Sequence, residues 1–384
     1  LLESLHKELA SKGMLHVLRH GFKCLGKPFC VAYFAPNNQL NPDTWKLYAE
    51  NRLSVTRQLY FSEQDKKSLD MVLFLNGLPI ATLELKNEMS GSETVEDAKK
   101  QYKERRNPKE LLFTFKRRAL VHFAVDTTQV YMTTELKGKQ THFLPFNRGY
   151  KHGAGNPPVE NAYATAYLWC EVLARDSLLS ILGKFMHLQV EEKKLYSPTG
   201  ITRIQKETLI FPRYHQLDVV RKLVAHTRVV GAGRNYLIQH SAGSGKSNSI
   251  AWLAHHLASL HNAADEKVFD TTIVVTDRRV LDQQLQKTIY QFEHKEGGIK
   301  RIDEDTRQLV DALTSHTPII ISTLQKFPFV VETIDKLNKR NKEKAEQADG
   351  DQGTYQPLAW TSNGKRFAVI VDEAHSSQTG ENAM

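Results

Sequence analysis

The sequence predicts two successive α/β units, and two observations carry that prediction. Short apolar strands alternate with amphipathic or charged helical segments along most of the chain. Residues 147–158 are rich in Gly, Asn and Pro, which is typical of a domain boundary. We therefore expect one unit over residues 1–150, a helical connector over 151–208 and a second unit over 209–384.

The first unit is expected to contain a β-hairpin between helices. An amphipathic helix is predicted at the start of the chain, with apolar positions from Leu2 to Leu18. Apolar residues 71–75 and 79–83 flank Asn76-Gly77, a dipeptide typical of tight hairpin turns. The remaining predicted elements are a charged helix at residues 95–106 and strands at 119–125 and 129–133.

In the second unit, apolar strands separated by helical segments predict a parallel sheet with crossover helices. The connector before it is expected to be helical from residue 165 to about residue 188. Residues 336–353 are charged and nearly free of apolar side chains, which favours a solvated insertion or loop. The strands are expected at residues 236–238, 272–276, 319–322 and 368–371.

The chain is basic, with 52 Lys and Arg against 43 Asp and Glu and a net charge of +9. This balance favours a polyanionic partner, although an ordinary basic protein would show it too. Three cysteines form no close pair, so a disulfide framework or a zinc ribbon is not expected. No apolar run reaches membrane-spanning length and the start has no secretory pattern, which predicts a cytoplasmic protein.

A phosphate-binding loop is predicted at Ser241-Ala242-Gly243-Ser244-Gly245-Lys246-Ser247. Small residues let backbone N–H groups approach phosphates, and the N-terminus of the following helix favours anions. Lys246 would reach the β- and γ-phosphates of ATP, and the Ser247 hydroxyl would help to hold Mg²⁺. His240 stands where the consensus has its first glycine, and a glycine-rich turn without a ligand remains the alternative.

Asp372-Glu373 strengthens the ATP prediction. The pair follows an apolar strand, at the edge where a parallel sheet presents ligands. Asp372 could bind Mg²⁺ through water, and Glu373 could polarise the attacking water.

Upstream of the loop, Phe211-Pro212-Arg213-Tyr214-His215-Gln216 resembles the same region of superfamily 2 helicases and translocases of the DEAH-box type. The resemblance implies that Gln216 contacts adenine. It also implies that residues 275–279 and 322–326, which follow two predicted strands, contact nucleic acid.

A second chemistry is predicted at Asp70, Glu84 and Lys86. Two carboxylates can hold Mg²⁺, and a lysine beside them can orient or deprotonate water for phosphodiester hydrolysis. Strand alternation places Glu84 and Lys86 on one face. A two-residue turn at Asn76-Gly77 would pair Asp70 with Leu83 and send Glu84 to the opposite face. A three-residue loop or a bulge would unite all three residues.

Charged residues at strand ends are more often solvated surface, so this pattern alone is weak. The basic segments 99–106 and 116–118 could lie along a phosphate backbone, or they could be solvated surface.

The ordered combination resembles the R subunit of type I restriction endonucleases. Its residues are Asn76-Gly77-Leu78-Pro79 leading into Glu84-Leu85-Lys86, followed by Asp372-Glu373-Ala374-His375-Ser376-Ser377-Gln378. The resemblance implies a PD-(D/E)xK nuclease domain followed by a RecA-like ATPase domain, as an N-terminal fragment of that subunit. It implies ATP and Mg²⁺ as cofactors, and double-stranded DNA with methyltransferase (M) and specificity (S) subunits as partners. Tyr102 would take the place of the tyrosine that related nucleases carry on the next helix.

Two alternatives stay open. The chain could belong to a helicase or translocase whose first domain only binds DNA. It could also be a non-enzymatic, ATP-sensing DNA-binding module.

Overall fold

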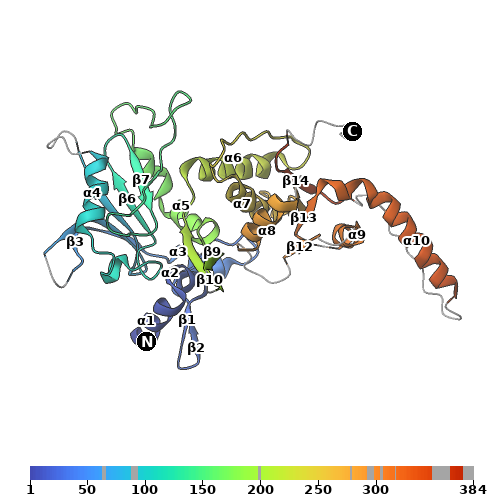
Figure 1. Ribbon diagram of the computed structural model, residues 1–384, viewed down its shortest axis with the longest axis horizontal. Coiled ribbons are helices and arrows are strands. Elements are labelled where there is room, and N and C mark those ends of the chain that lie inside the picture. The colour runs from blue at the N-terminus through green and yellow to red at the C-terminus, as the bar shows by residue number, and fades with distance from the viewer. Residues whose placement is uncertain are drawn as a thin grey trace. The chain divides into compact units, whose positions relative to one another are not determined.

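The computed structural model describes residues 1–62, 66–87, 94–197, 200–276, 279–291, 298–302, 306–315, 317–347 and 364–374. The chain forms two compact units, Leu1–Leu217 and Asp218–Met384 (Figure 1). The first unit thus includes the segment predicted as a connector. In the described part of the chain, no helix is long and apolar enough to cross a bilayer. All three cysteines are free.

A six-stranded sheet in the order β3-β4-β5-β6-β7-β8 forms the centre of the first unit. β5 and β6 are parallel, and the other neighbouring strands are antiparallel. A parallel pair requires a crossover. Here α4 (Val95–Arg105) lies between the two strands in the chain and packs against both. The strands are β3 (Leu53–Tyr60), β4 (Ser68–Leu75), β5 (Leu78–Leu85), β6 (Val121–Val125), β7 (Val130–Thr133) and β8 (Leu144–Pro145).

Helix α4 is fixed at its N-terminus by side chains. Thr94 and Asp97 form a capping box. The Asp126 carboxylate, just after β6, accepts a hydrogen bond from Val95 N at 2.9 Å. These contacts anchor the helix beside the end of β6, and its buried face consists of Val95, Ala98 and Tyr102.

The predicted first helix is two helices, α1 (Leu2–Lys12) and α2 (Met14–His20). Gly13 separates them with φ 87°, a conformation that glycine adopts readily. A Cβ on Gly13 would lie 2.9 Å from the carbonyl oxygen of Lys116, so the close approach also requires glycine. The other short elements here are β1 (Phe22–Cys24), β2 (Lys27–Phe29), α3 (Pro42–Ala49) and η2 (Leu111–Phe113).

The prediction of a helical connector over residues 151–208 is wrong for its second half. Helical turns do occur first, in η3 (Leu168–Val172), α5 (Arg175–Ser180) and η4 (Ile181–Phe185). The chain then forms an antiparallel hairpin of β9 (His187–Ser197) and β10 (Gly200–Ile210). Cross-strand pairing satisfies the backbone groups of both segments, and this tertiary arrangement overrides the local helical signal.

The second unit contains a parallel four-stranded sheet in the order β12-β13-β11-β14, as the sequence predicts. Its strands are β11 (Thr271–Thr276), β12 (Ile299–Arg301), β13 (Ile319–Thr323) and β14 (Phe367–Val371). The helical elements are α7 (Lys246–Ala258), α8 (Arg279–Gln291), α9 (Thr306–Thr314), η5 (Leu324–Phe329) and α10 (Val330–Gln347), while α6 (Tyr214–Val230) spans the division between the units.

The strand predicted at residues 236–238 does not form. Leu237 is 91% exposed and the segment has no strand pairing. Tyr236 instead bonds through its hydroxyl to His226 Nδ1 of α6 at 2.8 Å. A side-chain contact, rather than a backbone ladder, anchors this segment.

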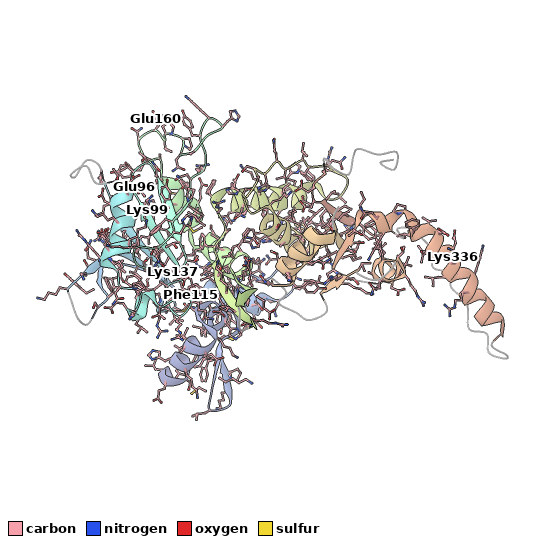
Figure 2. All side chains as sticks on the ribbon, viewed as in Figure 1. Glu96, Lys99, Phe115, Lys137, Glu160 and Lys336 are labelled. Carbon is pink, nitrogen blue, oxygen red and sulfur yellow. The ribbon has the colours of Figure 1, made fainter. Side chains whose placement is uncertain are left out.

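The charged segment that was expected to be a loop is helical up to Gln347, and residues 348–353 lie outside the described part of the chain. Val330 and Ile334 are buried against the core of the second unit. Lys336, labelled in Figure 2, pairs with Glu332 at 2.5 Å, and both side chains are exposed. An apolar stripe with charges opposite it is enough to make this segment an amphipathic helix.

Candidate active sites

A register shift in the β4–β5 hairpin decides which sheet face carries Glu84. The turn has two residues, because Leu75 pairs with Leu78 across it. Further along, Leu73 pairs with Ala81, and the register shifts between Leu73 and Phe74. β5 therefore contains one extra residue before Ala81. This bulge is one of the two arrangements, a three-residue loop or a bulge, that the cutting-site prediction required.

The shifted register places Asp70 directly across from Glu84. Met71 pairs with Leu83, so the preceding residue of β4 meets the following residue of β5. Lys86 N donates to the Val125 carbonyl at 2.8 Å, which continues β5 alongside β6. By strand alternation, Lys86 shares the face of Glu84. The structure therefore brings Asp70, Glu84 and Lys86 to one face.

Glu84 is completely buried, and one of its two carboxylate oxygens is bonded. Arg106 Nε donates to Glu84 Oε1 at 2.6 Å, and Arg106 is itself only 4% exposed. Glu84 Oε2 has no hydrogen-bond partner among the described residues. Burial raises the pKa of Glu84 to about 7, although the bond and charge of Arg106 oppose the shift, and the nearby Asp70 carboxylate adds to it.

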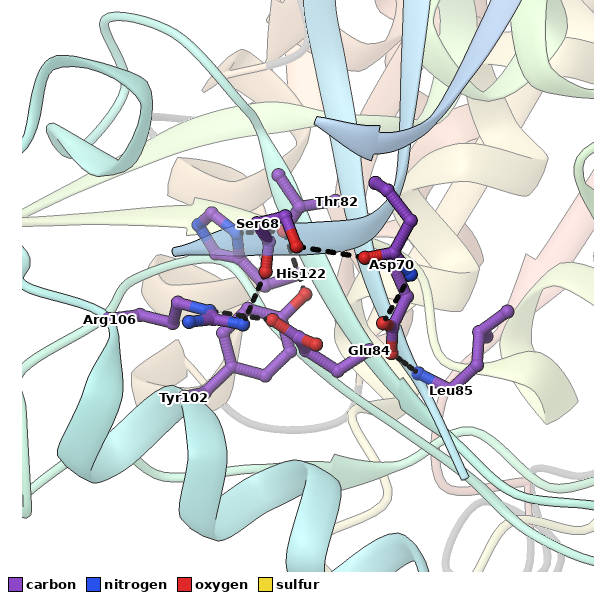
Figure 3. A network of polar contacts seen from close by, with 9 residues as sticks. Ser68, Asp70, Thr82, Glu84, Leu85, Tyr102, Arg106 and His122 are labelled. Atoms are coloured by element: carbon purple, nitrogen blue, oxygen red, sulfur yellow. Dashed lines mark hydrogen bonds and ion pairs between the residues drawn. The ribbon is translucent and has the colours of Figure 1, made fainter. Parts of the chain in front are cut away.

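Asp70 is half-buried and faces this unbonded oxygen from the neighbouring strand (Figure 3). Its Oδ2 accepts a hydrogen bond from Leu85 N at 2.8 Å, and its Oδ1 accepts one from Gln58 Nε2 at 3.2 Å. Two carboxylates that face each other, with one oxygen lacking a donor, fit a divalent cation. No group of three or more His, Cys, Asp or Glu side chains suited to a metal occurs in the described residues. Water and a bound phosphate would have to complete the coordination.

Lys86 also faces the first turn of α4. The pKa of Asp97 is lowered first by the backbone hydrogen bond at Thr94, and the positive charge of Lys86 lowers it further. The lysine charge therefore lies near the start of α4.

Tyr102 lies behind the carboxylates in a buried polar chain. Its hydroxyl is 2.8 Å from Thr82 Oγ1, which is 2.7 Å from His122 Nδ1. All three side chains are almost fully buried (Figure 3). Burial lowers the pKa of His122 to about 3, so this histidine is neutral. The structure thus gives the Tyr102 hydroxyl a partner on β5 instead of an open position.

The basic segment 99–106 divides between two environments. Arg106 points inward to Glu84, so neither of the two open interpretations, a phosphate contact or a solvated surface, fits this residue. Lys99 lies over the Tyr131 ring at 4.0 Å and pairs with the exposed Glu96, and its own side chain is only 13% exposed (Figure 2). Arg106 is the C-cap residue of α4, in an extended conformation directly after the last helical residue.

In the second unit, the predicted phosphate loop leads directly into α7. Gly245 caps the helix in a left-handed conformation with φ 84°, and Lys246 is the first helical residue. Ser244 N donates to the Ser241 carbonyl at 3.2 Å, and His240 Nδ1 lies 3.1 Å from Ser244 Oγ. His240 thus stabilises the loop from the position where the consensus has glycine.

Lys246 brings the two predicted ATP motifs together. Its ammonium group lies 2.9 Å from Asp372 Oδ1 and also pairs with Glu373. Asp372 N bonds to the Val275 carbonyl at 2.9 Å, which fixes the acidic pair at the end of β14 beside β11. Burial alone would lower the pKa of Lys246, but its hydrogen bonds to Glu373 and Asp372 and their charges outweigh burial and raise it.

Sequence comparison identifies both units. The family described as the type I restriction enzyme R protein N terminus matches residues 34–141, which include Asp70, Glu84 and Lys86. The SWI2/SNF2 ATPase family matches residues 215–384, which include the phosphate loop and the acidic pair. The chain combines an R protein N-terminal domain with a SWI2/SNF2 ATPase domain.

Proteins named as type I restriction enzyme endonuclease subunits resemble most of the chain. The MjaVIIIP subunit of Methanocaldococcus jannaschii is 25% identical over 358 residues, which cover 90% of this chain and 31% of the relative. The HindI subunit of Haemophilus influenzae is 25% identical over 348 residues, covering 87% and 28%. The SsaAORF53P subunit of Staphylococcus saprophyticus is 21% identical over 338 residues, covering 87% and 30%. The chain therefore spans only 28–31% of the length of these relatives.

At the start of the ATPase domain, Gln216 is 3% exposed. Its Oε1 accepts a hydrogen bond from Arg213 N at 2.9 Å, as a side chain near a helix N-terminus often does. The glutamine predicted to contact adenine thus also caps α6.

The other predicted motifs of the ATPase domain are only partly described. Asp277 and Arg278 lie outside the described residues, and so do residues 375–378 after the acidic pair. In the segment after β13, Lys326 Nζ donates to the Ile302 carbonyl at 2.6 Å. This lysine therefore has a structural contact within its own unit.

Proposed function

We propose that the R protein N-terminal domain is a PD-(D/E)xK nuclease that cleaves double-stranded DNA with Mg²⁺. The observation that carries the proposal is the buried Glu84 carboxylate, which faces Asp70 with one oxygen unbonded. An ion pair at a solvated surface would not require an unbonded oxygen of this kind. A buried carboxylate oxygen without a hydrogen bond costs free energy unless a ligand bonds to it.

In this proposal Asp70 and Glu84 hold the metal ion. Bound Mg²⁺ would activate water and stabilise the charge that develops on the attacked phosphate. Lys86 lies on the same sheet face, where it orients or deprotonates the water or stabilises the charged transition state. A phosphate of the DNA and water would complete the coordination that the two side chains leave open.

The SWI2/SNF2 domain would supply ATP-driven DNA translocation. The backbone N–H groups of the loop Ser241-Ala242-Gly243-Ser244-Gly245 would surround the phosphates of ATP. Lys246 would move from the acidic pair to the β- and γ-phosphates. Ser247 and Asp372 would hold Mg²⁺, Glu373 would polarise the attacking water, and Gln216 would contact adenine.

The whole protein would work in a type I restriction–modification complex with methyltransferase (M) and specificity (S) subunits and double-stranded DNA. The names of the relatives, which are endonuclease subunits of such enzymes, support this assignment. The two sites lie in different compact units, so we propose that cleavage and ATP hydrolysis are separate chemical steps.

The test is a plasmid-cleavage assay on the complete complex with Lys86→Ala. We expect cleavage to be lost while DNA-dependent ATP hydrolysis stays near normal, because Lys86 lies in the first unit. Cleavage at the wild-type rate would show that Lys86 is not catalytic.

One observation favours a competing function, a translocase whose first domain only binds DNA. The described residues provide just two carboxylates at the site and no larger metal-binding group. This function predicts that Asp70→Asn leaves all activities of the complex unchanged, whereas a nuclease loses cleavage.

A further inference from the structure

Asp70 and Glu84 belong to a row of polar residues that crosses three strands. In the β3–β4 pair, Arg57 pairs with Met71 and Leu59 pairs with Leu69. Gln58 of β3 therefore lies directly across from Asp70, on the side opposite Glu84. No motif in the sequence points to Gln58.

The Gln58 backbone has φ 50°, in the left-handed region that residues with a Cβ seldom adopt. Such a conformation within a strand persists only where the surroundings enforce it, and such outliers concentrate at functional sites. At this position the Gln58 side chain reaches across to Asp70 Oδ1.

Hydrogen bonds connect Gln58 to the far side of the site. Ser68 Oγ donates to Gln58 Oε1 at 2.8 Å. The carbonyl oxygen of Ser68 accepts a bond from Arg106 Nη2 at 2.8 Å, and Arg106 Nε holds Glu84 Oε1 (Figure 3). Leu85 N, which follows Glu84, closes the ring on Asp70 Oδ2.

We propose that Gln58, Ser68 and Arg106 are positioning residues that hold both carboxylates ready for a divalent cation. This inference rests on the proposed metal site. The ring bonds both oxygens of Asp70 and one oxygen of Glu84 from outside, and it leaves Glu84 Oε2 facing Asp70. Partners of metal ligands in this position fix the orientation of the ligands, and their loss commonly weakens metal binding by about ten- to a hundredfold.

The alternative is that Gln58 is an exposed side chain with an incidental hydrogen bond. A glycine substitution separates the two explanations. Gly accepts φ 50° without strain, so Gln58→Gly removes the amide and keeps the backbone path. Gln58→Ala removes the same amide but keeps the strain, so its melting temperature should not exceed that of Gln58→Gly.

The experiment is a calorimetric Mn²⁺ titration of this 384-residue chain. Every variant carries Asp372→Asn, so that the predicted metal site of the ATPase domain is removed. We expect Asp70→Asn to abolish binding at the first unit. Gln58→Gly and Ser68→Ala should each weaken it by about tenfold. Arg106→Lys should bind Mn²⁺ with an affinity between those of the parent and Asp70→Asn.

The outcomes separate this inference from the proposed function. Unchanged Mn²⁺ binding in Asp70→Asn would overturn the proposed metal site itself, and the proposed function with it. Lost binding in Asp70→Asn together with parental affinity in both Gln58→Gly and Ser68→Ala would overturn the positioning role and leave the metal site intact. Ser68→Ala breaks the ring without altering the left-handed backbone residue, so it decides the question even if Gln58→Gly lowers stability.

Discussion

Replacing Arg106 by Met should destabilise the first unit by an amount that grows with pH. Arg106 is buried against the buried Glu84 carboxylate at 2.6 Å. Removing one partner of such a pair leaves an uncompensated charge and typically costs about 3–5 kcal/mol. Glu84 can avoid part of that cost by keeping a proton, because its pKa is already about 7 in the intact pair.

The direction of the Glu84 pKa shift determines how the stability of the first unit changes with pH. Burial raises the pKa of Glu84 to about 7, well above the ordinary value, so its contribution favours the folded state at low pH and is lost as pH rises through about 7. Without Arg106 the pKa rises further, and the loss of stability continues above pH 7. Between a pH of about 5.5 and a pH of about 8.5, the stability deficit of the variant relative to wild type should grow by about 2 kcal/mol. The wild type stops losing stability near pH 7, and one pKa unit corresponds to about 1.4 kcal/mol.

The assay is urea denaturation of the chain at several pH values, comparing wild type with Arg106→Met and Arg105→Met. Arg105 is the exposed neighbour on the same helix, so its replacement should change the unfolding free energy by less than about 1 kcal/mol at every pH. Adding Glu84→Gln to Arg106→Met should remove the pH dependence. A pH-independent loss in Arg106→Met alone would refute the account of Glu84 as the titrating partner.

Three further outcomes are expected. Lys246→Ala in the complete complex should remove both ATP hydrolysis and DNA cleavage, and ATP-dependent cleavage in this variant would contradict the proposed order of events. The pKa values of His122 and His187 are lowered to about 3, mainly by burial, so stability present above about pH 6.5 should be lost on acidification. Replacing His122 by Asn should reduce the slope of unfolding free energy by about 1.4 kcal/mol per pH unit, measured between pH 6 and 4. Tyr102→Phe leaves the buried Thr82 hydroxyl with one partner fewer, so it should cost about 1–3 kcal/mol in urea denaturation and leave cleavage by the complex near wild type. Lost cleavage with unchanged stability would instead give the tyrosine a catalytic role.

The sequence predicted that the register of the β4–β5 hairpin must shift by one residue, but it did not predict where the extra residue lies. Alternation along strands showed that Asp70 and Glu84 share a face only if one extra residue enters the hairpin. It could not choose between a longer turn and a bulge, because both fit the Asn76-Gly77 signal. The structure keeps the two-residue turn and places the extra residue in β5, where the packing of the sheet decides the register.

The partners of the carboxylates were harder to find. Arg106 stands in a run of basic residues, so its charge suggested an exposed surface, and only the packing of α4 shows that it is buried. Gln58 meets Asp70 through pairing between separate strands, which leaves no local pattern. The incorrect prediction of a strand at residues 236–238 also has a non-local cause. An apolar run forms a strand only where another strand is available to pair with it.

The most direct test of the central claim is a crystal structure of this chain grown with Mn²⁺ and recorded at a wavelength where Mn²⁺ scatters anomalously. We predict an anomalous peak between the Asp70 and Glu84 carboxylates, with Glu84 Oε2 as a ligand and Glu84 Oε1 still held by Arg106. A well-ordered first unit without a peak at these two residues, at a concentration that occupies other sites, would contradict the proposal that this domain is a metal-dependent nuclease.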